Sequence, residues 1–189
     1  MNVMEGILTR RSIGRVKGDP VPKQLIEEIL HAATFAPNHF RTEPWRFIVL
    51  EGDARNRLGS LFEDITKLEL QDTTTEESQK KLKKVKGNPL RAPIIIAVAV
   101  EPQIRENVVV QEEYAAVHSA IQNMLLAAHS FGLGTIWRTG PLCYHEKVKE
   151  FFGLSDKGAL LGFIYIGYPD MEVKKVKKAS YKDVTTWLS

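Results

Sequence analysis

The apolar stretch RAPIIIAVAV, from Arg91 to Val100, constrains the fold of this chain more than any other feature. Its uninterrupted apolar part, Ile94 to Val100, is rich in β-branched residues, a composition typical of a strand buried on both faces. It is also the longest apolar run in the chain, and a membrane-spanning helix needs about 20 such residues. We therefore expect a buried strand here and no membrane partner.

The segment from Glu112 to Phe131 gives the strongest helix prediction in the chain. It is rich in small residues, which let another backbone lie close, and isoleucine and leucine widen its apolar surface. We therefore expect a central helix that is buried on most sides. Gly132 is its natural C-cap, because glycine readily adopts the left-handed conformation that ends helices.

Shorter patterns fill the rest of the chain. Helices are predicted over Pro22–Thr34, Asp53 to about Leu70 and His145–Phe152, and strands over Trp45–Leu50, Thr135–Thr139 and Ala159–Ile166. Asp53 is expected to cap its helix. The polar stretch from Leu70 to Gly87 reads as a surface excursion or lid with at most a solvated helical turn. No repeat or linker divides residues 1–189, so we expect one domain.

Charge and cysteine content limit the partners and the compartment. The formal net charge of +3 permits a phosphate-bearing ligand. Nucleic-acid binding is not expected, because the basic residues lie in three distant segments without interleaved aromatic residues. The single cysteine, Cys143, allows no internal disulfide. With no signal-peptide pattern in the first residues, these features favour a cytoplasmic protein.

Two common kinds of cofactor site are not predicted. The five histidines offer no close pair at metal-ligand spacing, so no metal is expected. The glycines of GLG, Gly132–Gly134, close a helix and enter a strand, whereas a dinucleotide-binding fingerprint must follow a strand and open a helix.

Arginines supply the candidate site residues. The stretch LTRRSIGR, from Leu8 to Arg15, places Arg10, Arg11 and Ser12 together in one loop. Guanidinium forks and a hydroxyl match phosphate oxygens, so this loop is a candidate anion clamp, although three basic residues in a loop are more often solvated. Arg138 lies inside an apolar strand, where a guanidinium must find an anion or carbonyls. It is the best single site candidate.

Four stretches together resemble one family. They are RRS near the start, HAATFAPNHFRTEPWRFIVL, AAVHSAIQNMLLAAHSFGLGTIWRTG and FIYIGYPD. In this order the chain is similar to the FMN-dependent nitroreductase family, and to its short, minimal branch. The resemblance implies an α+β fold with a mostly antiparallel sheet wrapped by helices. It also implies an intertwined homodimer with one FMN at each of two interface sites.

The resemblance assigns the FMN phosphate and ribityl chain to the loop of Arg10, Arg11 and Ser12. Lys178 stands roughly where many relatives carry a phosphate-binding arginine, and a lysine lacks the bidentate fork. Gly14 stands where many relatives carry a cation near N1 and O2 of the flavin. Glu43 replaces a common glutamine.

The ring of the flavin is assigned to two further segments. His39 matches a position that approaches the flavin bound mainly to the other subunit. Trp137, Arg138 and Thr139 match the turn beside the isoalloxazine.

These assignments imply an FMN enzyme in which NAD(P)H delivers hydride to flavin N5 and an acceptor then occupies the same pocket. Family acceptors include nitroaromatics and quinones, and no catalytic acid or base is evident because the flavin carries the chemistry. One alternative is flavin fragmentation or dehalogenation on the same fold, with the polar excursion as a lid. Another is a non-catalytic flavin-binding module.

Overall fold

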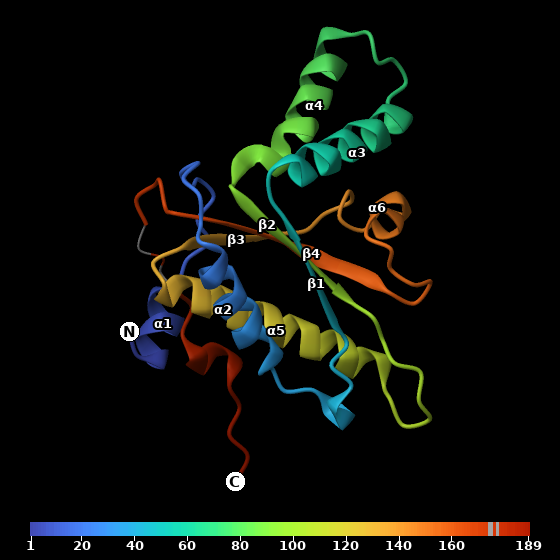
Figure 1. The fold of residues 1–189 in the computed structure, drawn as a ribbon. Coiled ribbons are helices and arrows are strands. Elements are labelled where there is room, and N and C mark those ends of the chain that lie inside the picture. Colours follow the sequence, from blue (N-terminus) through green and yellow to red (C-terminus); the bar gives the residue numbers. More distant parts are fainter. Residues whose placement is uncertain (174–175, 177) are drawn as a thin grey trace.

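A computed structural model describes residues 1–173, 176 and 178–189 of the chain (Figure 1). Its strands are β1 (Trp45–Leu50), β2 (Ile94–Val100), β3 (Gly134–Arg138) and β4 (Ala159–Gly167). They form one sheet in the order β1-β2-β4-β3, and every neighbouring pair is antiparallel. The apolar run is the fully buried central strand β2, as predicted.

Helices surround this sheet. The α-helices are α1 (Val3–Thr9), α2 (Lys23–Thr34), α3 (Asp53–Glu69), α4 (Glu76–Gly87), α5 (Val110–Ser130) and α6 (Glu146–Phe151). Single 3-10 turns are η1 (His39–Arg41), η2 (Asn88–Arg91) and η3 (Tyr181–Val184). In the described part of the chain, no helix is long and apolar enough to cross a membrane.

The two faces of the sheet pack against different helices (Figure 1). Ile96 and Val98 of β2 point into a core shared with α2 and α5. Ile95 and Ala97 point into a second core shared with α3 and α6. This alternation follows from the two-residue period of a strand, and it confirms the predicted α+β fold with helices on both faces of an antiparallel sheet.

Helix α5 is the central helix of the first core. Ala116, Ala120, Met124 and Ala128 are fully or almost fully buried, and α2 packs along the same helix. The small side chains permit this close packing. Gly132 adopts a φ of +75° just beyond the helix, as its predicted capping role requires.

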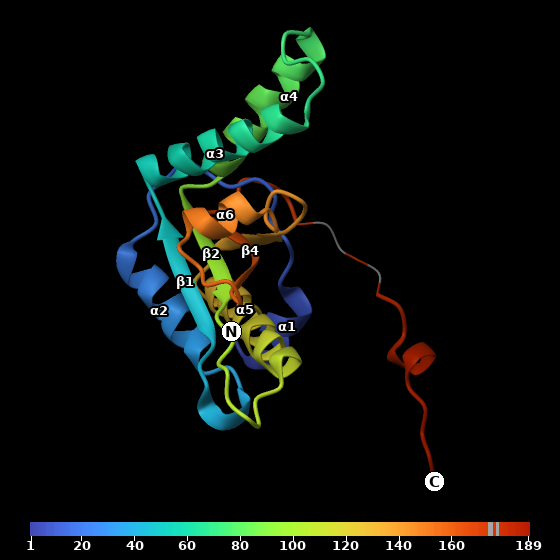
Figure 2. The same cartoon turned by 90° about the vertical axis from the view of Figure 1, so that its right-hand side faces the viewer.

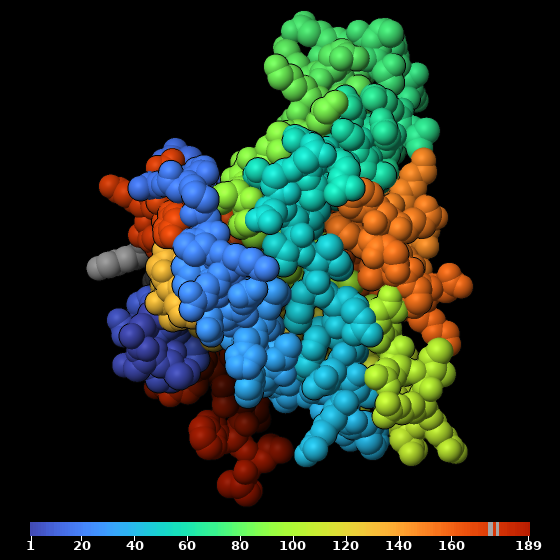
Figure 3. Space-filling view, in the orientation of Figure 1, coloured from blue at the N-terminus to red at the C-terminus, as the bar shows by residue number. Residues whose placement is uncertain are grey.

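Helices α3 and α4 form a hairpin that projects from the body of the molecule (Figures 2 and 3). The polar stretch expected to hold at most a helical turn forms the 12-residue helix α4. Thr75 caps this helix by accepting a hydrogen bond from the backbone N–H of Ser78. Leu82 is buried and Val85 is half-buried against the core of α3, so two apolar positions seat α4 on α3.

Two local details differ from the predictions. Asp53 is the first residue of α3 and not its cap. Gly52 occupies the capping position, and glycine has no side chain that could cap the helix. Helix α1 was not predicted. Asn2 caps it by accepting from the N–H of Glu5, and its Gly6 lies against Leu126 of α5.

Candidate functional site

The arginine loop and the segment after β4 enclose one cavity. Arg10, Arg11, Ser12 and Lys178 all line this cavity, whose volume is about 600 Å³. Its remaining lining residues are apolar: Ile7, Leu8, Ile13, Met171, Val173 and Val176. Both ends of the chain therefore contribute to the site, and they bring four of the predicted site residues together. We call it the arginine-loop cavity.

The loop is held in place by backbone hydrogen bonds to the edge of the sheet. The N–H of Ile13 donates to the carbonyl of Thr135 in β3 at 2.8 Å, and Ser12 forms a parallel bridge with Thr135. Farther along, the N–H of Lys17 donates to the carbonyl of Tyr168, just beyond β4. The loop thus continues the sheet beyond β3. These contacts hold the backbone at Ser12 and Ile13, directly after Arg10 and Arg11.

The cationic groups of this cavity are incompletely compensated. Burial lowers the pKa of Arg10, and the neighbouring charge of Arg11 lowers it further. The Nη1 atom of Arg11 donates to the carbonyls of Leu8 and Arg10, each at 2.8 Å. Its buried Nε has no hydrogen-bond partner among the described residues. A phosphate group, with a charge near −2 and three acceptor oxygens, fits such a site.

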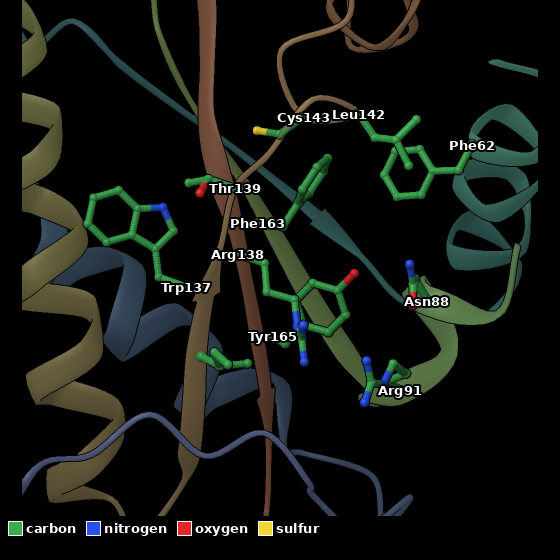
Figure 4. A pocket seen from close by; sticks show the side chains of 11 residues that line it. Phe62, Asn88, Arg91, Trp137, Arg138, Thr139, Leu142, Cys143, Phe163 and Tyr165 are labelled. Carbon is green, nitrogen blue, oxygen red and sulfur yellow. The ribbon is translucent and has the colours of Figure 1, made fainter. Parts of the chain in front are cut away.

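A second cavity lies between the end of β3 and the α3–α4 hairpin (Figure 4). It has a volume of about 350 Å³, and Trp137, Arg138 and Thr139 line it. The facing residues come from several elements: Phe62 of α3, Asn88 and Arg91 of η2, Phe163 and Tyr165 of β4, and Leu142 and Cys143 after β3. We call it the hairpin cavity.

Trp137 is fixed by contacts with β4. Its Nε1 donates to the carbonyl of Leu161 at 3.1 Å. A Cβ atom on Gly162 would overlap the indole ring, so glycine is needed at this crossing. The ring lies near His118 of α5, with 5.7 Å between the ring centroids. These contacts set the orientation of the end of β3, where the site residues lie.

Arg138 enters the hairpin cavity as a half-buried cation. Its guanidinium carbon lies 5.2 Å from the centre of the Tyr165 ring, a cation–π arrangement. Its buried Nε has no hydrogen-bond partner in the part of the chain that the structure describes. The expectation that this guanidinium must find an anion or carbonyls is therefore unmet within the described chain.

His39 lies apart from both cavities, on η1. Its Nδ1 is 2.6 Å from a carboxylate oxygen of Glu112, at the start of α5. The segment around η1 is anchored by the buried carboxylate of Glu113. This carboxylate accepts from the hydroxyl of Thr42 at 2.5 Å and from the backbone N–H of Gln103 at 3.1 Å. His39 lines neither cavity of its own chain.

The predicted residues therefore divide into three places. Arg10 and Arg138 do not line a common cavity, but Ser12 of the first cavity is bridged to Thr135 of β3, whose last residue, Arg138, lines the second. From Thr135, beside Ser12, to Arg138 the strand advances roughly 10 Å. A long ligand with a phosphate at one end and a ring at the other matches such a separation.

Sequence reasoning missed the far wall of the hairpin cavity. Phe62, Asn88 and Arg91 come from segments that precede β3 by more than 40 residues, and only the fold brings them to it. One signal was available for Arg91, a cation placed three residues before the most apolar strand of the chain.

Comparisons with known proteins agree with this architecture. The profile of the Nitroreductase family matches residues 7–168. A Bacillus subtilis protein provisionally named NAD(P)H nitroreductase YfhC is 36% identical over 91% of this chain and 86% of its own length. A solved nitroreductase-like family protein from Bacillus cereus aligns with a TM-score of 0.82 and 29% identity, over 100% of this chain and 96% of its own.

A more distant relative is an iodotyrosine deiodinase of Danio rerio, 24% identical over 93% of this chain and 63% of its own length. The family profile covers the arginine loop, β3 and the hairpin cavity, and it ends before the residues from Met171 to Lys178 that complete the arginine-loop cavity. The chain therefore belongs to the nitroreductase family.

Proposed function

We propose that the protein passes hydride from NAD(P)H through flavin N5 to nitroaromatic, quinone or similar acceptors, in two half-reactions that use the same pocket in turn. The observation that carries this proposal is the arginine-loop cavity. In it, Arg10, Arg11, Ser12 and Lys178 converge from opposite ends of the chain, and the buried Nε of Arg11 is unpaired among the described residues.

The phosphate of FMN would be held in that cavity. Arg10 and Arg11 supply charge-assisted hydrogen bonds, Ser12 adds a hydroxyl, and Lys178 adds a cation from the segment after β4. Burial first, and then the charge of the adjacent Arg11, lower the pKa of Arg10, and a bound dianion would offset that repulsion.

The ring would lie by the turn at the end of β3. Trp137 and Thr139 would position it, and Arg138 would supply a cation that favours negative charge on the reduced ring. When bound, FMN supplies the redox chemistry, since its ring accepts a hydride from the nicotinamide and returns it to the acceptor. The protein's own task is to bind and orient the reactants.

The site is proposed to be completed by a second copy of the chain. His39 lines neither cavity of its own protomer, which is consistent with a role at the flavin of the partner. Apolar side chains of α1 and the C-terminal tail are exposed in the single chain: Met4, Ile7, Leu8, Val184, Trp187 and Leu188. A homodimer would cover such surfaces.

An absorbance spectrum of the purified protein tests this function. We expect a flavin spectrum that bleaches on anaerobic addition of NADH or NADPH and returns on addition of menadione. Steady-state NAD(P)H oxidation at several menadione concentrations should give parallel double-reciprocal lines. A protein that stays colourless after incubation with FMN and dialysis would contradict the proposal.

Arginine variants then test the residues. Arg10→Ala combined with Arg11→Ala should weaken FMN binding by roughly a hundredfold or more, because hydrogen bonds to charged groups contribute about 1.5–3 kcal/mol each. Arg57→Ala, which removes an exposed cation on α3, should leave FMN affinity unchanged. Equal effects of the two changes would argue against a phosphate site at Arg10 and Arg11.

Reductive dehalogenation is the second candidate. The α3–α4 hairpin provides a projecting element beside the hairpin cavity, and the deiodinase relative makes this chemistry worth testing. Iodide release from 3-iodotyrosine by the dithionite-reduced protein would support it. Rapid turnover of menadione without iodide release would favour the first function. Family membership weighs against a flavin-binding module without catalysis.

A further inference from the structure

The hairpin cavity contains two guanidinium groups and no carboxylate. Arg138 enters it from β3 and Arg91 from η2 (Figure 4). Among the described residues that line the cavity, none is Asp or Glu. Two positive charges therefore face one space of about 350 Å³ without an opposite charge on its walls.

The weakly acidic groups on the same walls do not compensate this charge. Burial raises the pKa of Tyr165 to about 12, although Arg138 and Arg91 oppose that rise. Burial also raises the pKa of the Cys143 thiol to about 12. Both groups are therefore neutral near pH 7, and the cavity keeps its positive charge.

The rest of the cavity is shaped for a flat, apolar group. Phe62 lies on the hairpin side and Phe163 and Tyr165 on the sheet side, while the indole of Trp137 points away from them toward α5 (Figure 4). Aromatic walls favour stacked or edge-to-face contacts with a ring. The amide of Asn88 adds a hydrogen-bonding group beside Arg91.

We propose that the hairpin cavity selects acceptors that are planar aromatic anions, with the carboxylate or equivalent group held by Arg91 and Arg138. This inference rests on the proposed function and names the substrate class of that same site. A planar anion satisfies the guanidinium groups by charge-assisted hydrogen bonds, and its ring would pack against Phe62 on the hairpin side, beside the flavin ring proposed at the end of β3. Arg91 sets specificity, since it is exposed and comes from η2, an element with no residue assigned to FMN.

The test compares 4-nitrobenzoate with 4-nitrobenzamide, which has the same ring and nitro group but no charge. With the FMN-loaded enzyme, kcat/KM for the benzoate should exceed that for the benzamide by roughly tenfold, the effect of about 1.4 kcal/mol. The difference should reside in KM. In Arg91→Gln the ratio should fall to about one, and in Arg91→Lys it should be intermediate, because lysine keeps the charge and loses the fork.

Arg57→Gln is the matched control, because it removes an exposed arginine from the outer surface of α3 and should leave the ratio unchanged. A wild-type ratio of one or less, or a ratio that Arg91→Gln does not alter, would overturn the inference. Equilibrium dialysis of both compounds against the purified protein gives a second readout that needs no turnover. Failure of the proposed function would appear instead as absent FMN binding and absent menadione reduction, while dialysis still decides whether the cavity prefers the anion.

Discussion

At the scale of the residue, burial decides which groups of the hairpin cavity react. Cys143 is 3% exposed, and burial raises its pKa to about 12. Because the thiolate is the reactive form, we expect native protein at pH 8 to react with a thiol reagent such as DTNB far more slowly than unfolded protein. The absorbance of released thionitrobenzoate, with and without urea, measures the difference. Equal rates under the two conditions would show that the cavity opens readily.

Single residues also show where sequence reasoning reaches its limit. The cluster of Arg10, Arg11 and Ser12 could be chosen from the sequence because its members are adjacent. Their meeting with Lys178 required the family resemblance, since more than 160 residues separate the two segments. Arg91 was missed because its one local signal, a cation three residues before the most apolar strand, is equally typical of a solvated arginine at a strand entrance.

At the scale of the element, periodic apolar patterns predicted the strands and the helices α2, α3, α5 and α6 to within a few residues. Helix α1 and most of α4 were missed for a physical reason. Each presents little apolar surface to the body, and each depends on a polar cap and on contact with one neighbouring helix. Most helical stability comes from tertiary packing, which a local pattern does not contain.

The hairpin offers a prediction of its own at Gly59. A Cβ atom there would overlap the backbone carbonyl oxygen of Lys86 in α4. Gly59→Ala should therefore separate the helices and destabilise the protein by about 1–3 kcal/mol. Urea unfolding gives this free energy, and trypsin cleavage at the α4 lysines should become faster. Gly87→Ala is the control, because no atom lies within 4 Å of its added Cβ. Comparable losses in both variants would contradict a specific contact.

The contact between α1 and α5 predicts a dependence of stability on pH. His129 of α5 lies 2.9 Å from the hydroxyl of Thr9, and its pKa is lowered by burial first and then by the charges of Arg10 and Arg11. The folded state therefore binds a proton less readily than the unfolded state. Stability from this group is present above the ordinary histidine pKa of 6.5 and is lost as the pH falls through the lowered value.

We expect the melting temperature of FMN-free protein to fall between pH 7.5 and pH 5.5, and to fall less in His129→Gln, whose side chain takes no proton. The exposed His31 on α2 provides the control, and His31→Gln should keep the wild-type pH dependence. If His129→Gln and the wild type have parallel melting curves across this range, another group causes the acid sensitivity.

At the scale of the whole molecule, the layered α+β fold was predictable because the family resemblance implied it, whereas the apolar patterns alone predicted the buried strand β2 and the central helix α5. Assembly lies beyond the single chain. Trp187 is 86% exposed and Leu188 94% exposed, on a tail that runs away from the body (Figure 2). Exposed apolar groups such as these remain in contact with water until another chain covers them, which is unfavourable. We therefore propose that the tail forms part of the homodimer interface.

We therefore expect sedimentation equilibrium to give twice the 21.3 kDa of one chain for the full-length protein. Replacing Val184, Trp187 and Leu188 together by serine should shift the protein toward monomer and weaken FMN binding, since the partner is proposed to bring His39 to each flavin. Lys182→Ser is a control in the same tail that removes no apolar surface. A triple variant that remains dimeric and keeps its flavin would place the interface elsewhere. One that becomes monomeric but binds FMN with unchanged affinity would show that each chain holds its flavin alone.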